Sequence, residues 1–174
     1  MGRLREKSKR FTTKNHMSMH VLIGIIASII ITKAFPLYSY PKILLVCVIG
    51  SILPDIDHLL YIFWYKRRGD YARDAKKLLR SLGIRAYINF AKENHKKLTD
   101  VYSHNLFTVL FFVILSYLYF SEEHVLGLSL CLSIAFHFVF DLFEDFLFMG
   151  KLNSNWILKF NKDKTKGYKS SKED

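Results

Sequence analysis

Four long apolar segments limit the fold of this 174-residue sequence more than any other feature. A helix needs about 20 mostly apolar residues to cross roughly 30 Å of hydrocarbon. Each segment meets or nearly meets that length, and the four segments are residues 19–38, 40–65, 104–120 and 124–148. Short connections join the first pair and the second pair, which is typical of helical hairpins. The sequence therefore predicts an all-α integral membrane protein built as a four-helix bundle.

Basic residues avoid these segments almost completely. The chain has 26 lysines and arginines and a net charge of +11, and all of them except Lys33 and Lys42 fall in residues 1–20, 66–103 and 149–174. Positively charged flanks of membrane helices stay in the cytoplasm. We therefore expect both termini on the cytoplasmic side of the cell (inner) membrane. This topology explains the charge more simply than a nucleic-acid partner does.

The long connection, residues 66–103, reads as a cytoplasmic amphipathic helical segment. Asp70 can begin a helix over residues 71–82, Gly83 can end it, and residues 84–95 can form a second one. A basic helix with leucines on one side can lie on anionic lipid, and a solvated loop is an equally good interpretation. Residues 1–150 thus form the membrane domain, followed by a polar, lysine-rich tail, residues 151–174, that we expect to be mobile.

The second apolar segment contains an interruption. Gly50 and Ser51 are followed by Pro54, which lacks a backbone donor, so a kinked or broken helix is expected there. Broken membrane helices are tolerated where they are buried in protein or line a cavity.

Ionisable side chains inside the apolar segments are the candidates for function, because burying them in a membrane is costly. All four segments carry theirs in the half nearer the cytoplasm, which indicates one common site. We assign His16, His95 and His124 to the interface instead. The candidates are His20, Asp55, Asp57, His58, His104, His137, Asp141, Glu144 and Asp145.

The spacing of His137 and Asp141, four residues apart, allows both side chains to reach one metal ion. A histidine and aspartate set suits zinc, manganese or iron. The cytoplasmic halves of the segments contain no lysine or arginine to neutralise the acids. A cation from outside is therefore needed, and a divalent metal is favoured over a path for protons or other ions.

Residues 50–58 read GSILPDIDH, and with this segment the chain resembles the YdjM-type family of membrane-bound metal-dependent hydrolases, first named from a LexA-regulated inner-membrane protein. That family also shows an early histidine, a Thr-His-Ser-type segment and a late His-x-x-x-Asp pair. Their counterparts are His20, SHN at residues 103–105, and His137 with Asp141. The chain departs from the family at Thr99, where many members have histidine.

The resemblance implies that the protein hydrolyses a phosphoester at the cytoplasmic interface. The favoured substrate is a phosphoester that belongs to a lipid. One or two divalent ions, zinc above all, would act with Asp55 or Glu144 as base, and His58 and Asp145 are possible additional ligands. The implied metal ligands are His20, Asp55, Asp57, His104, His137 and Asp141.

Two alternatives remain open. An ion or proton transporter predicts a polar stripe that continues to the outer face, whereas residues 126–135 are nearly all apolar. A non-catalytic membrane partner predicts a closed, structural metal site. Membrane lipids are the expected partners in every case, with a phospholipid or lipid phosphate as the substrate of a hydrolase.

Overall fold

A computed structural model describes residues 2–94, 101–146, 152, 156 and 157. Every regular element in these residues is helical, as the sequence predicts. The chain divides into two compact units, which are described separately below. Unit 1 comprises residues 1–54 and 104–152, and unit 2 comprises residues 55–103 and 153–174.

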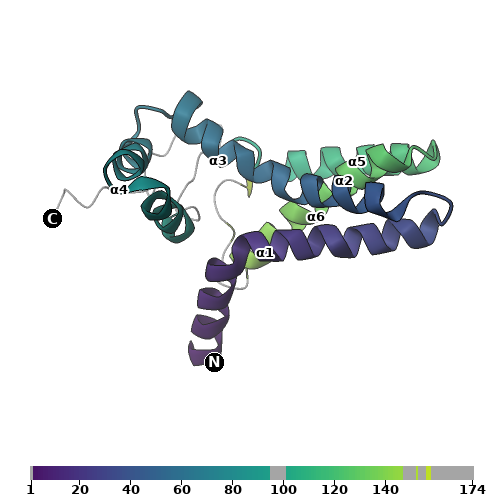
Figure 1. Cartoon of the computed structure of the whole chain (residues 1–174), viewed down its shortest axis with the longest axis horizontal. Helices are drawn as coiled ribbons and strands as arrows, with labels where there is room; N and C mark the ends of the chain where they lie inside the picture. Colours follow the sequence, from purple (N-terminus) through teal and green to yellow (C-terminus); the bar gives the residue numbers. More distant parts are fainter. Residues whose placement is uncertain (1, 95–100, 147–151, 153–155, 158–174) are drawn as a thin grey trace. The chain divides into compact units, whose positions relative to one another are not determined.

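Unit 1 contains four helices that lie side by side: α1 (Gly2–Ala34), α2 (Tyr40–Ile52), α5 (Leu106–Ser121) and α6 (Val125–Glu144) (Figure 1). α6 packs against each of the other three, and α1 also packs against α2. α6 accordingly has buried residues along its whole length. Polar side chains on α6 are therefore held at the centre of the unit, where the other helices can contribute partners.

Glycines allow α2 to approach its two neighbours closely. A Cβ atom on Gly24 of α1 would lie 2.7 Å from Ser51 Oγ and 2.9 Å from the Cys47 carbonyl oxygen. A Cβ atom on Gly50 would lie 2.8 Å from the Leu130 carbonyl oxygen of α6. Small residues permit this kind of backbone contact between apolar helices. The close packing places the C-terminal end of α2 directly against α6.

Three helical segments of the described chain are long and apolar enough to cross a membrane: Lys14–Ala34, Tyr40–Tyr65 and Val125–Glu144. α5 is apolar but has 16 residues, which is about 24 Å of helix against about 30 Å of hydrocarbon. The structure therefore supports a helical membrane protein with three candidate spans. The fourth span, and the cytoplasmic placement of the termini, stay predictions.

The boundaries of the first helix differ from those expected. α1 starts at Gly2 rather than near residue 19, and it bends at Asn15, whose φ and ψ are −108° and 17°. It ends at Ala34 rather than at residue 38. The residue before a proline disfavours the helical conformation, so Pro36 accounts for the early end.

The predicted interruption of the second apolar segment is confirmed. α2 ends at Ile52 and is followed by a 3-10 turn, η1 (Leu53–Asp55), by the short helix α3 (Ile56–Leu60) and by a π-helical turn, η2 (Tyr61–Tyr65). Backbone carbonyls at the end of α2 are consequently available for contacts outside the helix.

The later segments also begin and end differently from the prediction. α5 starts at Leu106, so His104 lies in the segment that leads into the helix, and the Asn105 side chain caps α5 by accepting a hydrogen bond from Thr108 N at 2.9 Å. α6 starts after His124, whose Nδ1 accepts from Gly127 N at 3.0 Å. Residues 147 and 148 of the predicted fourth segment lie outside the described residues.

Unit 2 contains α3, η2 and α4 (Asp70–Asn94), which packs against η2. Gly83 has φ of +80° inside α4, and this confirms the predicted division of the connection into two helices. The hydrophobic core of unit 2 consists of Ile62, Tyr71, Ala72, Ala75, Tyr87 and Val101. His95 and Thr99 lie outside the described residues, as does nearly all of the predicted tail.

Candidate metal centre

Four polar residues are buried together inside unit 1, and we call them the histidine–aspartate cluster: His20, His104, His137 and Asp141. They are 0%, 6%, 0% and 3% exposed, respectively. They come from α1, from the segment that precedes α5, and from α6. The structure therefore brings together four of the residues that the sequence nominated from separate segments.

The Asp141 carboxylate is the centre of the cluster. Its Oδ2 atom lies 3.2 Å from His104 Nε2 and 3.4 Å from His137 Nε2. Its Oδ1 atom lies 3.8 Å from His20 Nε2. Three imidazole nitrogens thus face one carboxylate in the buried interior of unit 1.

A backbone carbonyl at the interrupted end of α2 fixes one of these rings. His137 Nδ1 lies 2.7 Å from the Ser51 carbonyl oxygen. A carbonyl only accepts hydrogen bonds, so Nδ1 must carry a proton and donate it. Neutral His137 then has its lone pair on Nε2, facing a carboxylate oxygen that also has only lone pairs. A cation between the two acceptors would resolve this conflict, and a backbone carbonyl behind a ligating histidine is common at metal sites.

The geometry of the donors fits a divalent ion. Metal–nitrogen bonds of about 2.0–2.1 Å in a tetrahedral site place neighbouring donor atoms about 3.3 Å apart. The distances from Asp141 to His104 and His137 match this spacing. The ligand atoms of His20, His137 and Asp141 also lie within 4.8 Å of one another. These buried residues can therefore hold a metal ion.

His16 belongs to the same region, contrary to its assignment to the interface. Its Nε2 lies 3.1 Å from His20 Nε2, and its Nδ1 lies 3.5 Å from Glu144 Oε2. Glu144 is 5% exposed, and Asp145, which caps α6, is also buried. The spacing of His16 and His20, four residues apart, was the signal that could have indicated a shared face.

The remaining predicted site residues, Asp55, Asp57 and His58, belong to unit 2, and all three are half-buried. The Asp57 carboxylate accepts hydrogen bonds from Tyr65 Oη at 2.9 Å and from Ser103 N at 2.8 Å. Ser103 directly precedes His104 in the chain. Both hydrogen bonds of Asp57 are made within unit 2. Metal ligation by these three residues stays a prediction.

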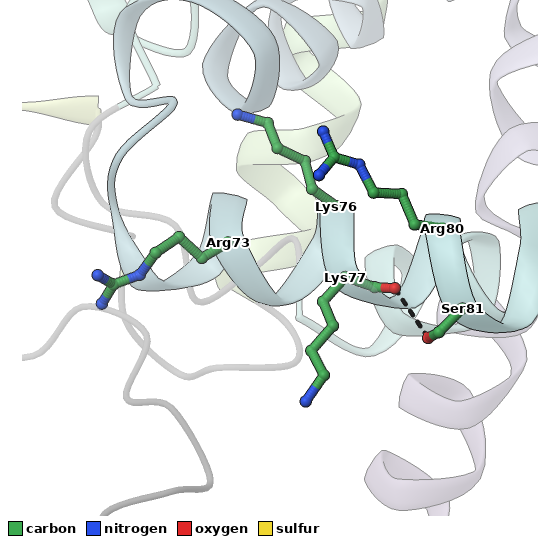
Figure 2. Close-up of a pocket in the computed structure, with 5 residues that line it drawn as sticks. All are labelled: Arg73, Lys76, Lys77, Arg80 and Ser81. Atoms are coloured by element: carbon green, nitrogen blue, oxygen red, sulfur yellow. Dashed lines mark hydrogen bonds between the residues drawn. The ribbon is translucent and has the colours of Figure 1, made fainter.

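A second polar feature, the α4 basic surface, consists of Arg73, Lys76, Lys77 and Arg80. With Ser81 these side chains line an open pocket of about 440 Å³ in unit 2. Figure 2 shows that they diverge, with Lys76 and Arg80 extending to one side of the helix and Lys77 to the other. Lys76 Nζ donates to the Arg67 carbonyl at 3.0 Å. The charges are thus spread over a surface rather than directed at one point.

The family model described as YdjM inner membrane protein matches residues 16–148 of the chain. The matched region starts at His16 and includes every residue of the histidine–aspartate cluster. No curated protein and no solved structure was found to match the chain.

Proposed function

The chain belongs to the YdjM inner membrane protein family, and we propose that it is a membrane-embedded, metal-dependent hydrolase that cleaves a phosphoester. The proposal rests above all on the pairing of His137 Nε2 with the Asp141 carboxylate, because in neutral His137 the hydrogen bond from Nδ1 to the Ser51 carbonyl leaves Nε2 as an acceptor that faces an ionised carboxylate. Apolar helices surround this pair. A buried carboxylate and three imidazoles favour a bound divalent cation over an empty polar site.

In this proposal His20, His104, His137 and Asp141 hold the ion, and zinc suits three nitrogens and one oxygen best, with manganese or iron as alternatives. A divalent ion would act as a Lewis acid on the phosphoryl oxygens and would make a water molecule more acidic. Glu144 lies on α6 near Asp141 and is the proposed base. Asp55 remains the alternative base.

A lipid-borne phosphoester is the proposed substrate class. Membrane lipids contact a protein of this family, and two of the helices that supply the cluster, α1 and α6, contain segments long and apolar enough to cross a membrane. The α4 basic surface carries the opposite charge to a phosphate head group. Both features favour an anionic amphiphile over a small soluble ester.

Metal content tests the proposal directly. Protein purified in detergent without chelators should contain at least one equivalent of zinc, manganese or iron by elemental mass spectrometry. His137→Ala should lose most of this metal, whereas Ser129→Ala, a buried polar change on the same helix outside the cluster, should retain it. Size-exclusion profiles of both variants check that they fold. A metal-free wild-type protein would rule the proposal out.

Hydrolysis separates the proposed function from its alternatives. The metal-loaded protein should cleave bis-(p-nitrophenyl) phosphate or phosphatidic acid in mixed micelles, and a chelator should abolish the reaction. Bound metal without any hydrolysis would favour a structural metal site. Ion transport has less support, because residues 125–136 of α6 contain no charged or histidine side chain that would continue the stripe.

A further inference from the structure

Next to the histidine–aspartate cluster, α1 and α6 carry a second set of ligand atoms. His16, Asp141 and Glu144 each offer one atom, and these atoms lie within 4.8 Å of one another. We propose that this set is a second divalent-cation subsite, with Asp141 shared between the two ions. The inference extends the proposed function, since it assumes that the first ion binds at the cluster, and it makes Glu144 a metal ligand, which leaves Asp55 as the base.

The two carboxylate oxygens of Asp141 face different partners. Oδ2 faces His104 and His137, whereas Oδ1 faces α1, where it lies 3.8 Å from His20 Nε2, an atom that is itself 3.1 Å from His16 Nε2. An ionised carboxylate has about four lone-pair directions on two oxygens. Asp141 can therefore bridge two cations, which in two-metal hydrolases lie about 3.5–4 Å apart.

His16 and Glu144 complete the second subsite from opposite helices. His16 Nδ1 lies 3.5 Å from Glu144 Oε2, close to the donor spacing around one ion. Their side chains are 13% and 5% exposed, and the two facing atoms, His16 Nδ1 and Glu144 Oε2, are both buried. The second ion would thus be enclosed by protein, as the first is.

His16 directly follows the bend in α1 and shares its helical stretch with His20. The helix departs from regular geometry at Asn15, and the Asn15 side chain donates to the Phe11 carbonyl at 2.9 Å. One turn separates His16 from His20, and rather less than one turn separates Asp141 from Glu144. Two packed helices therefore present two ligands each, at facing positions.

The competing interpretation is a simple ion pair. A protonated His16 beside Glu144 would hold α1 against α6 without any metal. The two interpretations differ in stoichiometry, because an ion pair leaves one metal per chain and a second subsite gives two. A histidine with two carboxylates suits zinc or manganese as the second ion.

The experiment counts metal in the whole chain in detergent after saturation with Zn²⁺ and removal of the excess. Wild type should bind two equivalents, and His16→Ala and Glu144→Gln should each bind one. Met17→Ala, an exposed change beside His16, should still bind two. One equivalent in wild type and in both variants would overturn the second subsite and leave the proposed function intact. No metal in wild type would overturn both.

A measurement on the wild-type chain alone covers the case in which the variants fail to fold. Protein loaded with Mn²⁺ should give the exchange-coupled electron paramagnetic resonance spectrum of two neighbouring ions, as expected for a spacing of about 3.5–4 Å. The spectrum of isolated Mn²⁺ at full loading would contradict the proposal. Where His16→Ala folds, its spectrum should change to that of an isolated ion.

Discussion

The histidine–aspartate cluster of unit 1 and the α4 basic surface of unit 2 arrange polar groups in opposite ways. In the cluster, side chains from distant segments converge on Asp141 and are almost fully buried. On α4, consecutive turns of one helix carry cationic side chains that diverge from one another (Figure 2). Convergence requires a tertiary fold, whereas divergence requires only a helix. The cluster therefore forms a binding site, whereas the α4 basic surface produces a positive electrostatic field without a defined binding position.

The energetic consequences differ equally. Removing an ionised carboxylate from water costs several kcal/mol unless a partner offsets the loss, so the burial of Asp141 requires cationic or protonated neighbours. An exposed lysine keeps most of its hydration and gains about 1 kcal/mol or less from a neighbouring charge. Substitutions of charged side chains should therefore produce large effects in the cluster and small effects on the α4 basic surface.

Asp141→Ala should give the largest effect in the molecule. Asp141 is a ligand in both proposed subsites, so this variant should lose all bound metal, and hydrolysis should fall to background. Elemental analysis and phosphodiester hydrolysis measure the two losses. Asp74→Ala replaces an aspartate of α4 and serves as the control, with unchanged metal content expected. Retention of a full equivalent by Asp141→Ala would show that the cluster is not the metal centre.

Two glycine substitutions separate packing from site geometry. In Gly50→Ala the new Cβ meets the Leu130 carbonyl oxygen at 2.8 Å, which should cost about 1–3 kcal/mol. In Gly83→Ala nothing lies within 4 Å, but φ of +80° should cost a similar amount, about 1–3 kcal/mol. Thermal unfolding in detergent should therefore show comparable losses of stability for both variants.

Metal affinity should distinguish these two variants. Gly50→Ala shifts the end of α2, and with it the Ser51 carbonyl that orients His137, so the affinity should fall about 10- to 100-fold. Gly83→Ala should leave the affinity unchanged because it alters only α4. Competition with a fluorescent zinc chelator measures both values. Equal affinities would mean that the α2 carbonyl does not position the ligand.

Several local features of the fold follow from single residues and were predictable. Pro54 removes a donor, and α2 ends just before it; Gly83 takes φ of +80°, and α4 divides there. Such signals are local, because the residue itself restricts the backbone. The early end of α1 at Ala34 follows from Pro36 in the same way, although the hydropathy of residues 35–38 suggested a longer helix.

The site could be predicted only in part. Their common depth in the apolar segments indicated four residues of the site: His20, His104, His137 and Asp141. Depth can be predicted because it follows from the number of residues between a side chain and the end of its segment. His16 was missed although its spacing of four residues from His20 indicates a shared helix face. Its approach to Glu144 depends on the packing of α1 against α6, which no short pattern encodes. The role of Asp57 likewise depends on Ser103, which lies 46 residues away in the sequence.

The smallest effect is expected from Lys77→Gln on the α4 basic surface. One basic residue near an anionic membrane contributes about 1 kcal/mol, or roughly fivefold in affinity. Native mass spectrometry should show that Lys77→Gln retains phosphatidylglycerol about fivefold more weakly than wild type, and that phosphatidylcholine and metal content do not change.

The Lys77→Arg variant tests whether the α4 basic surface attracts lipid through its electrostatic field alone or binds it in a shaped pocket. A field depends on charge alone, so Lys77→Arg should bind phosphatidylglycerol as wild type does, and added salt should weaken both proteins equally. A shaped pocket would distinguish the point charge of lysine from the planar fork of arginine. If Lys77→Arg binds phosphatidylglycerol weakly, the α4 basic surface would be a shaped binding site like the cluster. The proposed difference between the two regions would then be wrong.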